Sequence, residues 1–134
     1  MPTLFLVITA FNLACLTATA ALGYLVGGSS TTQWHPLAGV AAVLICVCTH
    51  CIVFTYFIAT AKWMQHAVTV RGLDEALVAP TRSIKVLAFP AALLAMAATF
   101  ATAISGAASV NYLIWPVWHH VLSWAALAVN LLVA

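Results

Sequence analysis

Histidine is the side chain in this sequence whose chemistry most needs an explanation. Five histidines occur in a 134-residue chain in which 66% of the residues are hydrophobic and 4% are charged. Four of them lie in apolar stretches, and two of these, His119 and His120, are adjacent within the string WPVWHHVLSW at 115–124. Imidazole is a good ligand for haem iron and for copper. Because an ionisable group inside a membrane segment is costly, its presence predicts a functional site.

Haem ligation between facing helices is the chemistry that these histidines favour. His35 and His50 are fifteen residues apart, which returns them to nearly the same helix face, about 22 Å apart along the axis. His119 lies on the small and polar face of the last apolar segment. Since bundle cores commonly hold cofactors between facing helices, we expect a b-type haem between the second and fourth segments. Gly39 would let the flat macrocycle approach the backbone, and Phe54 would stack on it.

A copper site is the second chemistry open to the same side chains. His35, His119 and His120 would meet at the outer surface, and imidazole suits copper well. Such a site needs groups that fix the ring tautomers, and the sequence places no carboxylate there. The string CVCTHC at 46–51 is not a comparable site, because Cys46 and His50 share a helix face while the other two cysteines point elsewhere.

Four apolar segments must position these histidines: residues 3–27, 36–63, 84–106 and 114–134. Each is about as long as the 20 residues that a helix needs to cross a hydrocarbon core of about 30 Å. Unbroken apolar runs indicate helices rather than barrel strands. The sequence therefore predicts an all-α integral membrane four-helix bundle, a single transmembrane domain over residues 1–134. In the connection 64–83, Asp74 and Glu75 would suit the start of a short surface helix.

A faint internal repeat favours two helical hairpins in parallel orientation. Residues 19–23 (TAALG), which precede His35, resemble residues 102–106 (TAISG), which precede His119. A repeat of this kind relates two hairpins by an axis along the membrane normal. It would place His35 and His119 at equal depth near the outer surface and favours them as a ligand pair.

Residue counts from the opposite surface favour a different pair. His50 is twelve residues from Lys62, and His119 is about fifteen from the carboxyl terminus, or roughly 18 and 22 Å at helical rise. Pairing at this depth also avoids burying the terminal carboxylate in hydrocarbon. We therefore expect His50 with His119 or His120 as ligands, and we keep His35 as the outer alternative.

The positive charges predict how the chain is oriented. All the lysines and arginines flank or occupy the connection 64–83: Lys62, Arg71, Arg82 and Lys85. The positive-inside rule makes that connection cytoplasmic and puts both termini on the same side. We expect the chain in a bacterial inner membrane. Four cations are too few for a nucleic-acid surface, so no nucleic-acid partner is expected.

A small electron-transfer subunit is the function that these features favour. No Asp or Glu lies within the predicted spans, and no nucleophile or phosphate-loop pattern supports independent catalysis. We expect a non-catalytic, cytochrome-like subunit of a respiratory complex, which passes electrons between quinone and other membrane subunits. The alternatives are a cofactor-free scaffold subunit of a larger membrane complex and the copper-binding membrane protein described above.

Overall fold

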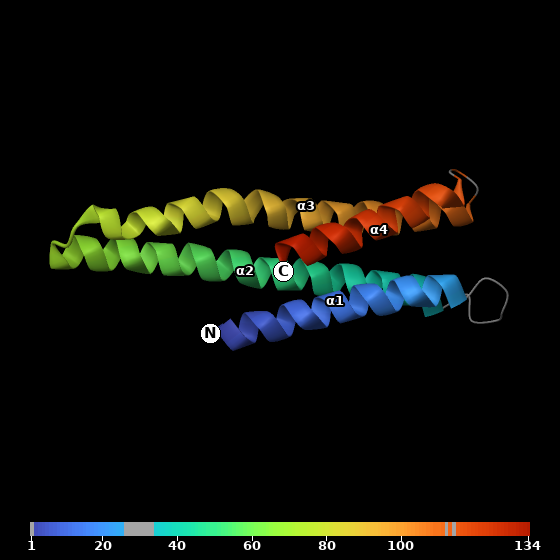
Figure 1. The fold of residues 1–134 in the computed structure, drawn as a ribbon, viewed down its shortest axis with the longest axis horizontal. Coiled ribbons are helices and arrows are strands. Elements are labelled where there is room, and N and C mark those ends of the chain that lie inside the picture. Colours follow the sequence, from blue (N-terminus) through green and yellow to red (C-terminus); the bar gives the residue numbers. More distant parts are fainter. Residues whose placement is uncertain (1, 26–33, 112, 114) are drawn as a thin grey trace.

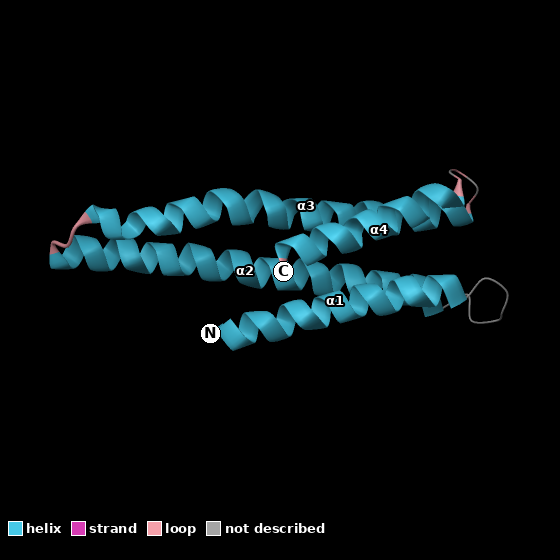
Figure 2. Ribbon diagram, viewed as in Figure 1, coloured by secondary structure: helices cyan, strands magenta, loops and turns pink. Residues whose placement is uncertain are grey.

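Four long helices make up most of the chain in the computed structural model, which describes residues 2–25, 34–111, 113 and 115–134. In order, the elements are α1 (Pro2–Leu25), α2 (Trp34–Arg71), the short 3-10 helix η1 (Glu75–Val78), α3 (Ala79–Val110) and α4 (Pro116–Val133). Each long helix runs antiparallel to the one before it (Figure 1). The described residues contain no strand (Figure 2), so the predicted all-helical class is confirmed.

The four long helices are long and apolar enough to cross a membrane. Their large side chains point outward, and Leu132 for example is 86% exposed. The buried residues are mostly small, and they include Ala42, Ala92, Ala95 and Ala126. In lipid no hydrophobic drive pushes helices together, so contacts favour small residues that let backbones approach closely. The distribution of side chains therefore suits an apolar surrounding.

The two helical hairpins pack side by side. α1 packs on α2, α3 packs on α4, and α2 and α3 join the hairpins, while α1 and α4 meet over a shorter length. Figure 1 shows that α2 and α3 reach well past the amino end of α1 and the carboxyl end of α4. We call this projecting end of the bundle the Gly72 end and the opposite end the His35 end.

The connection expected at 64–83 is mostly helix, which corrects the prediction. α2 continues to Arg71, and α3 begins at Ala79. Polar residues such as Lys62 and Gln65 follow the apolar run, so the hydropathy pattern stops there. Lysine and glutamine, like Met64 between them, are good helix formers, and the helix therefore continues. The chain turns instead at Gly72, whose φ of 61° is a conformation that glycine adopts without steric cost.

The short helix expected near Asp74 and Glu75 is present as η1. The Asp74 carboxylate accepts a hydrogen bond of 2.9 Å from the backbone N–H of Ala76, the usual role of Asp at a helix start. Val78 is buried, and η1 packs on both α2 and α3. The Gly72 end is therefore a folded helical hairpin with a tight turn.

Candidate functional site

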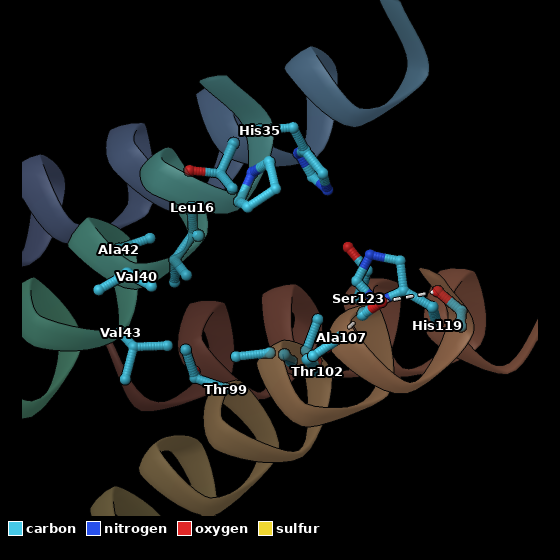
Figure 3. A pocket seen from close by; sticks show the side chains of 18 of the residues that line it. Leu16, His35, Val40, Ala42, Val43, Thr99, Thr102, Ala107, His119 and Ser123 are labelled. Atoms are coloured by element: carbon cyan, nitrogen blue, oxygen red, sulfur yellow. Dashed lines mark hydrogen bonds between the residues drawn. The ribbon is translucent and has the colours of Figure 1, made fainter. Parts of the chain in front are cut away.

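Two histidines on different helices face each other at the His35 end. His35 lies in the first turn of α2, His119 lies in the first turn of α4, and their ring centroids are 6.0 Å apart at an interplanar angle of 71°. Figure 3 shows the two side chains approaching each other from α2 and α4. Metal–imidazole bonds are about 2.0–2.1 Å long, so two rings that bind one ion from opposite sides have centroids about 6 Å apart.

A cavity of about 270 Å³ adjoins the two rings and is lined by all four helices. It is partly open to the outside of the bundle, and its volume is close to the lower end of the range of about 300–1,000 Å³ for small-molecule sites. Small residues form much of its wall: Ala20, Gly39, Ala42, Ala103, Ser123 and Ala126. We call it the His35–His119 cavity.

Each of the two rings lies against a glycine of the preceding helix. A Cβ atom added to Gly23 of α1 would lie 2.8 Å from Cε1 of His35, and one added to Gly106 of α3 would lie 2.9 Å from Cε1 of His119. Real Cβ atoms essentially never come so close to another atom. Gly39 differs, because an added Cβ there would meet nothing within 4 Å. The glycines at 23 and 106 therefore allow the imidazoles to approach the backbone.

A threonine one turn before each glycine joins the two helices of its hairpin. The Thr102 hydroxyl lies 2.9 Å from the backbone carbonyl of Leu122 in α4 and equally close to that of Ala98 in its own helix, so these two acceptors share its one proton. The Thr19 hydroxyl makes the matching, longer contact of 3.4 Å with the carbonyl of Ala38 in α2. The sequence repeat contains this signal as threonine and glycine four residues apart.

Hydrogen bonds determine which nitrogen of His119 is free. Its Nδ1 lies 3.1 Å from the backbone oxygen of Thr102 and 3.2 Å from Oγ of Ser105. Because a carbonyl oxygen only accepts, Nδ1 carries the proton and Nε2 keeps its lone pair. Metal-ligating histidines are commonly held in this way, with the other ring N–H donated to a carbonyl.

The ring of His35 has fewer hydrogen-bond partners than the ring of His119. Its Nδ1 is buried and has no hydrogen-bond partner among the described residues. Leu22 lies one residue before Gly23 in α1, where α3 has Ser105 one residue before Gly106. The two histidines are therefore packed alike but hydrogen-bonded differently.

The expected pairing of His50 with His119 or His120 is not formed. His50 is only 6% exposed, and its Nε2 lies 3.3 Å from Oδ1 of Asn130, near the carboxyl end of α4. The last turns of α4, rather than its first turn, are therefore level with His50. The residue count failed because it placed the end of α4 level with Lys62, whereas α2 and α3 extend past α4 (Figure 1).

The remaining predicted site residues divide between the cavity and other contacts. Gly39 lines the His35–His119 cavity. Phe54 packs edge-on against Phe89, with centroids 4.8 Å apart, and lines neither cavity described here. His120 is exposed, and its ring stacks on Tyr24 at 5.3 Å. Phe54 is thus placed away from the facing histidine pair. The His120 ring lies 6.0 Å from that of His119, at an interplanar angle of 47°, but it does not line the cavity.

The three-histidine copper site is not formed in this structure. In the part of the chain that the structure describes, no three His, Cys, Asp or Glu side chains are arranged to hold a metal ion. The His120 ring is 6.0 Å from that of His119, but it stacks on Tyr24 at 5.3 Å and does not line the cavity between His35 and His119. Two facing imidazoles could share a metal only if another molecule supplied the remaining ligands.

A buried polar cluster adjoins the His35–His119 cavity and contains Asn12, Cys46, His50, Thr99 and Asn130. Asn130 is at its centre: its amide nitrogen donates to the Thr99 hydroxyl at 3.1 Å. Its Oδ1 accepts from Asn12 Nδ2 at 3.2 Å and from Cys46 Sγ at 3.4 Å. Because the members come from all four long helices, the cluster fixes how the two hairpins meet.

Comparison with known proteins does not identify this site. The chain matches no protein-family model and has no significant match among curated proteins or solved structures. A functional conclusion must therefore come from the geometry itself.

Proposed function

We propose that this chain is an integral membrane electron-transfer subunit for one b-type haem, which His35 and His119 would hold through their imidazoles. The observation that carries the proposal is the facing pair itself. The two rings are 6.0 Å apart, and each is seated against a glycine backbone. The helices α2 and α4 are those that the sequence favoured, whereas the ligand on α2 is His35 in place of His50.

The residues present fit a haem in their chemistry. The bond from Nδ1 of His119 to the Thr102 carbonyl leaves Nε2 available to iron. The small side chains on all four helices allow a flat macrocycle to lie close to the backbones. A macrocycle also brings its own four nitrogen ligands, which accounts for a site with two histidines and no third protein ligand among the described residues.

The side chains of the cavity would control the properties of such a group. Bound there, a haem supplies a centre that takes up and releases a single electron. The glycine seats hold both imidazoles in orientation, and the hydrogen bonds to His119 raise the basicity of that ligand. Leu16, Val43 and Leu127 line the cavity and exclude water, which is a further control on the potential.

The two hairpins are proposed to be copies of one unit related by an axis along the membrane normal. Glycine–histidine and threonine–carbonyl contacts occur in both α1–α2 and α3–α4, which supports this relation. Each copy would then contribute one axial ligand. Such a site needs both hairpins, so neither would bind haem alone.

The proposed setting is a bacterial inner membrane, with quinone and other membrane subunits as redox partners. All the lysines and arginines of the chain lie at the Gly72 end, and by the positive-inside rule this supports a cytoplasmic location for this end and for both termini.

Absorption spectroscopy of the purified full chain tests the proposal. Protein produced in cells with sufficient haem is expected to show a Soret band that shifts on reduction with dithionite. The pyridine haemochrome assay should then identify haem b at about one per chain. A colourless protein that folds and assembles with partner subunits would overturn the proposal and leave the cofactor-free scaffold reading.

A further inference from the structure

A second cavity of about 620 Å³ lies toward the Gly72 end, beside the polar cluster. This volume is within the range of about 300–1,000 Å³ that small-molecule sites occupy. Three neighbouring aromatic rings form part of its wall: Phe5 and Tyr56 have centroids 4.7 Å apart, and Tyr56 and Phe57 are 5.8 Å apart. The wall on α3 includes Ala88 and Ala91. We call it the His50 cavity.

The orientation of the Asn130 amide determines the hydrogen bonding at this cavity. Its Nδ2 lies 2.9 Å from the carbonyl oxygen of Ala126 and 3.5 Å from that of Ala95, and both oxygens can only accept. Oδ1 of Asn130 must therefore face the other way. There it accepts from Asn12 Nδ2 at 3.2 Å, from His50 Nε2 at 3.3 Å and, at a longer distance of 3.4 Å, from Cys46 Sγ.

Two of the donors to Asn130, His50 and Asn12, each have a second polar atom that can accept a hydrogen bond. A neutral imidazole that donates through Nε2 keeps a lone pair on Nδ1. Asn12 donates through Nδ2, and its Oδ1 is buried with no hydrogen-bond partner among the described residues. Asn12 is 2% exposed, His50 is 6% exposed, and both line the cavity. Because an unpaired buried acceptor is unfavourable, a ligand of this cavity should bring hydrogen-bond donors.

We infer that the His50 cavity binds the headgroup of a quinol, an aromatic ring with hydroxyl donors and an apolar tail. The hydroxyl groups match His50 Nδ1 and Asn12 Oδ1, and the ring packs against Phe5, Tyr56 and Phe57. A quinone carbonyl only accepts, so it does not satisfy these two atoms. The acyl chain of a lipid brings no donor at all.

The polar cluster also connects this cavity with the first. Thr99 lines the His35–His119 cavity and accepts a hydrogen bond of 3.1 Å from Asn130, which lines the His50 cavity. The link between quinol binding and electron transfer rests on the proposed function, whereas the binding itself does not require a haem.

Anaerobic titration of the purified full chain in detergent, with a short-tailed quinol and with its dimethyl ether, tests the inference. The ether keeps the aromatic ring and the tail but has lost both donors. We expect the quinol to bind about tenfold more tightly, because the ether leaves buried acceptors unpaired. Equal affinities would overturn the inference.

Two alanine variants on α3 locate the site. Ala91→Leu fills part of the His50 cavity and should weaken quinol binding about tenfold. The matched control is Ala97→Leu, because Ala97 is exposed on the same helix and lines neither cavity. His50→Phe should reduce the preference for the quinol over the ether. If Ala91→Leu and Ala97→Leu bind the quinol equally well, the ligand is not in this cavity.

The visible spectrum of each titrated sample separates this inference from the proposed function. If protein without a Soret band prefers the quinol to its ether, the quinol site is supported and the haem proposal is refuted. A Soret band without any preference would remove the quinol site alone.

Discussion

The α1–α2 and α3–α4 hairpins hold a histidine in the same way but support it differently. In both, the imidazole lies against a glycine of the first helix, at 2.8 Å and 2.9 Å from the position of an added Cβ. Only in α3–α4 do a carbonyl and a hydroxyl contact the ring nitrogen, at His119. Close approach of the imidazole to the backbone of the preceding helix is therefore common to the two hairpins. The hydrogen bonds to the imidazole are what differs between them.

Matching positions of the two hairpins also meet in the interior. Cys46 and Asn130 each lie eleven residues after the facing histidine of their hairpin, His35 and His119. Their side chains are hydrogen-bonded at 3.4 Å. Asn130 has several further partners, so α3–α4 contributes the centre of the polar cluster and α1–α2 contributes a smaller group to it.

The largest expected effect comes from removing either facing histidine. We expect His35→Ala and His119→Ala each to abolish the dithionite-sensitive Soret band, because a haem bound by one ligand is held far less tightly. His120→Ala is the control, since that ring stacks on Tyr24. Retention of the band in His35→Ala together with its loss in His50→Ala would show that the ligand on α2 is His50.

The next largest effect is expected from substituting Gly23 and Gly106, the glycines against which the two imidazoles lie. The effect should be equal in the two hairpins. Gly23→Ala and Gly106→Ala each force the imidazole away from the backbone, and overpacking of this kind costs about 1–3 kcal/mol. Thermal unfolding and haem content would both report it. Gly39→Ala has room for the methyl group and should be neutral or slightly stabilising. Three equal effects would contradict the close approach at positions 23 and 106.

Exchanging the residues beside the glycines should reverse the asymmetry between the hairpins. Leu22→Ser offers the unpaired Nδ1 of His35 a hydroxyl like that of Ser105, and a hydrogen bond contributes about 0.5–1.5 kcal/mol. We expect a rise in the unfolding temperature. Ser105→Ala should lower it, although His119 keeps its bond to Thr102. If both substitutions destabilise the protein, the matching of these two positions is wrong.

The smallest effect is expected at the threonines that join the helices of each hairpin. Interhelical hydrogen bonds in membrane proteins contribute about 0.6 kcal/mol on average. Thr102→Val should cost more than Thr19→Val, because the two contacts measure 2.9 Å and 3.4 Å. Unfolding in mixed micelles would measure both. The reverse order would show that the closer hydrogen bond does not make α3–α4 the better joined hairpin.

The existence of four helices was predictable because length and apolar composition alone indicate a membrane-crossing helix. The helix ends at the Gly72 end were not. Hydropathy reports where side chains become polar, and between Lys62 and Arg71 the chain becomes polar while it stays helical. The connection was therefore predicted far too long.

The error at the helix ends explains why His35, rather than the expected His50, faces His119. The choice of His50 over His35 depended on the depth of each residue, which was counted from the assumed cytoplasmic ends of two helices. Those ends are not level, so the count was displaced along the bundle. The internal repeat had no such dependence, because it compares each histidine with the glycine of its own hairpin, and it identified the facing pair.

The unequal helix lengths have a structural consequence. α2 has 38 residues and is about 57 Å long, whereas α4 has 18 residues and is about 27 Å long, close to a hydrocarbon core of about 30 Å. The four helices end at nearly the same level at the His35 end (Figure 1). The additional length of α2 and α3 therefore projects as a two-helix hairpin beyond α1 and α4. Any molecule that contacts the Gly72 turn therefore contacts the same two helices, α2 and α3, that form walls of both cavities.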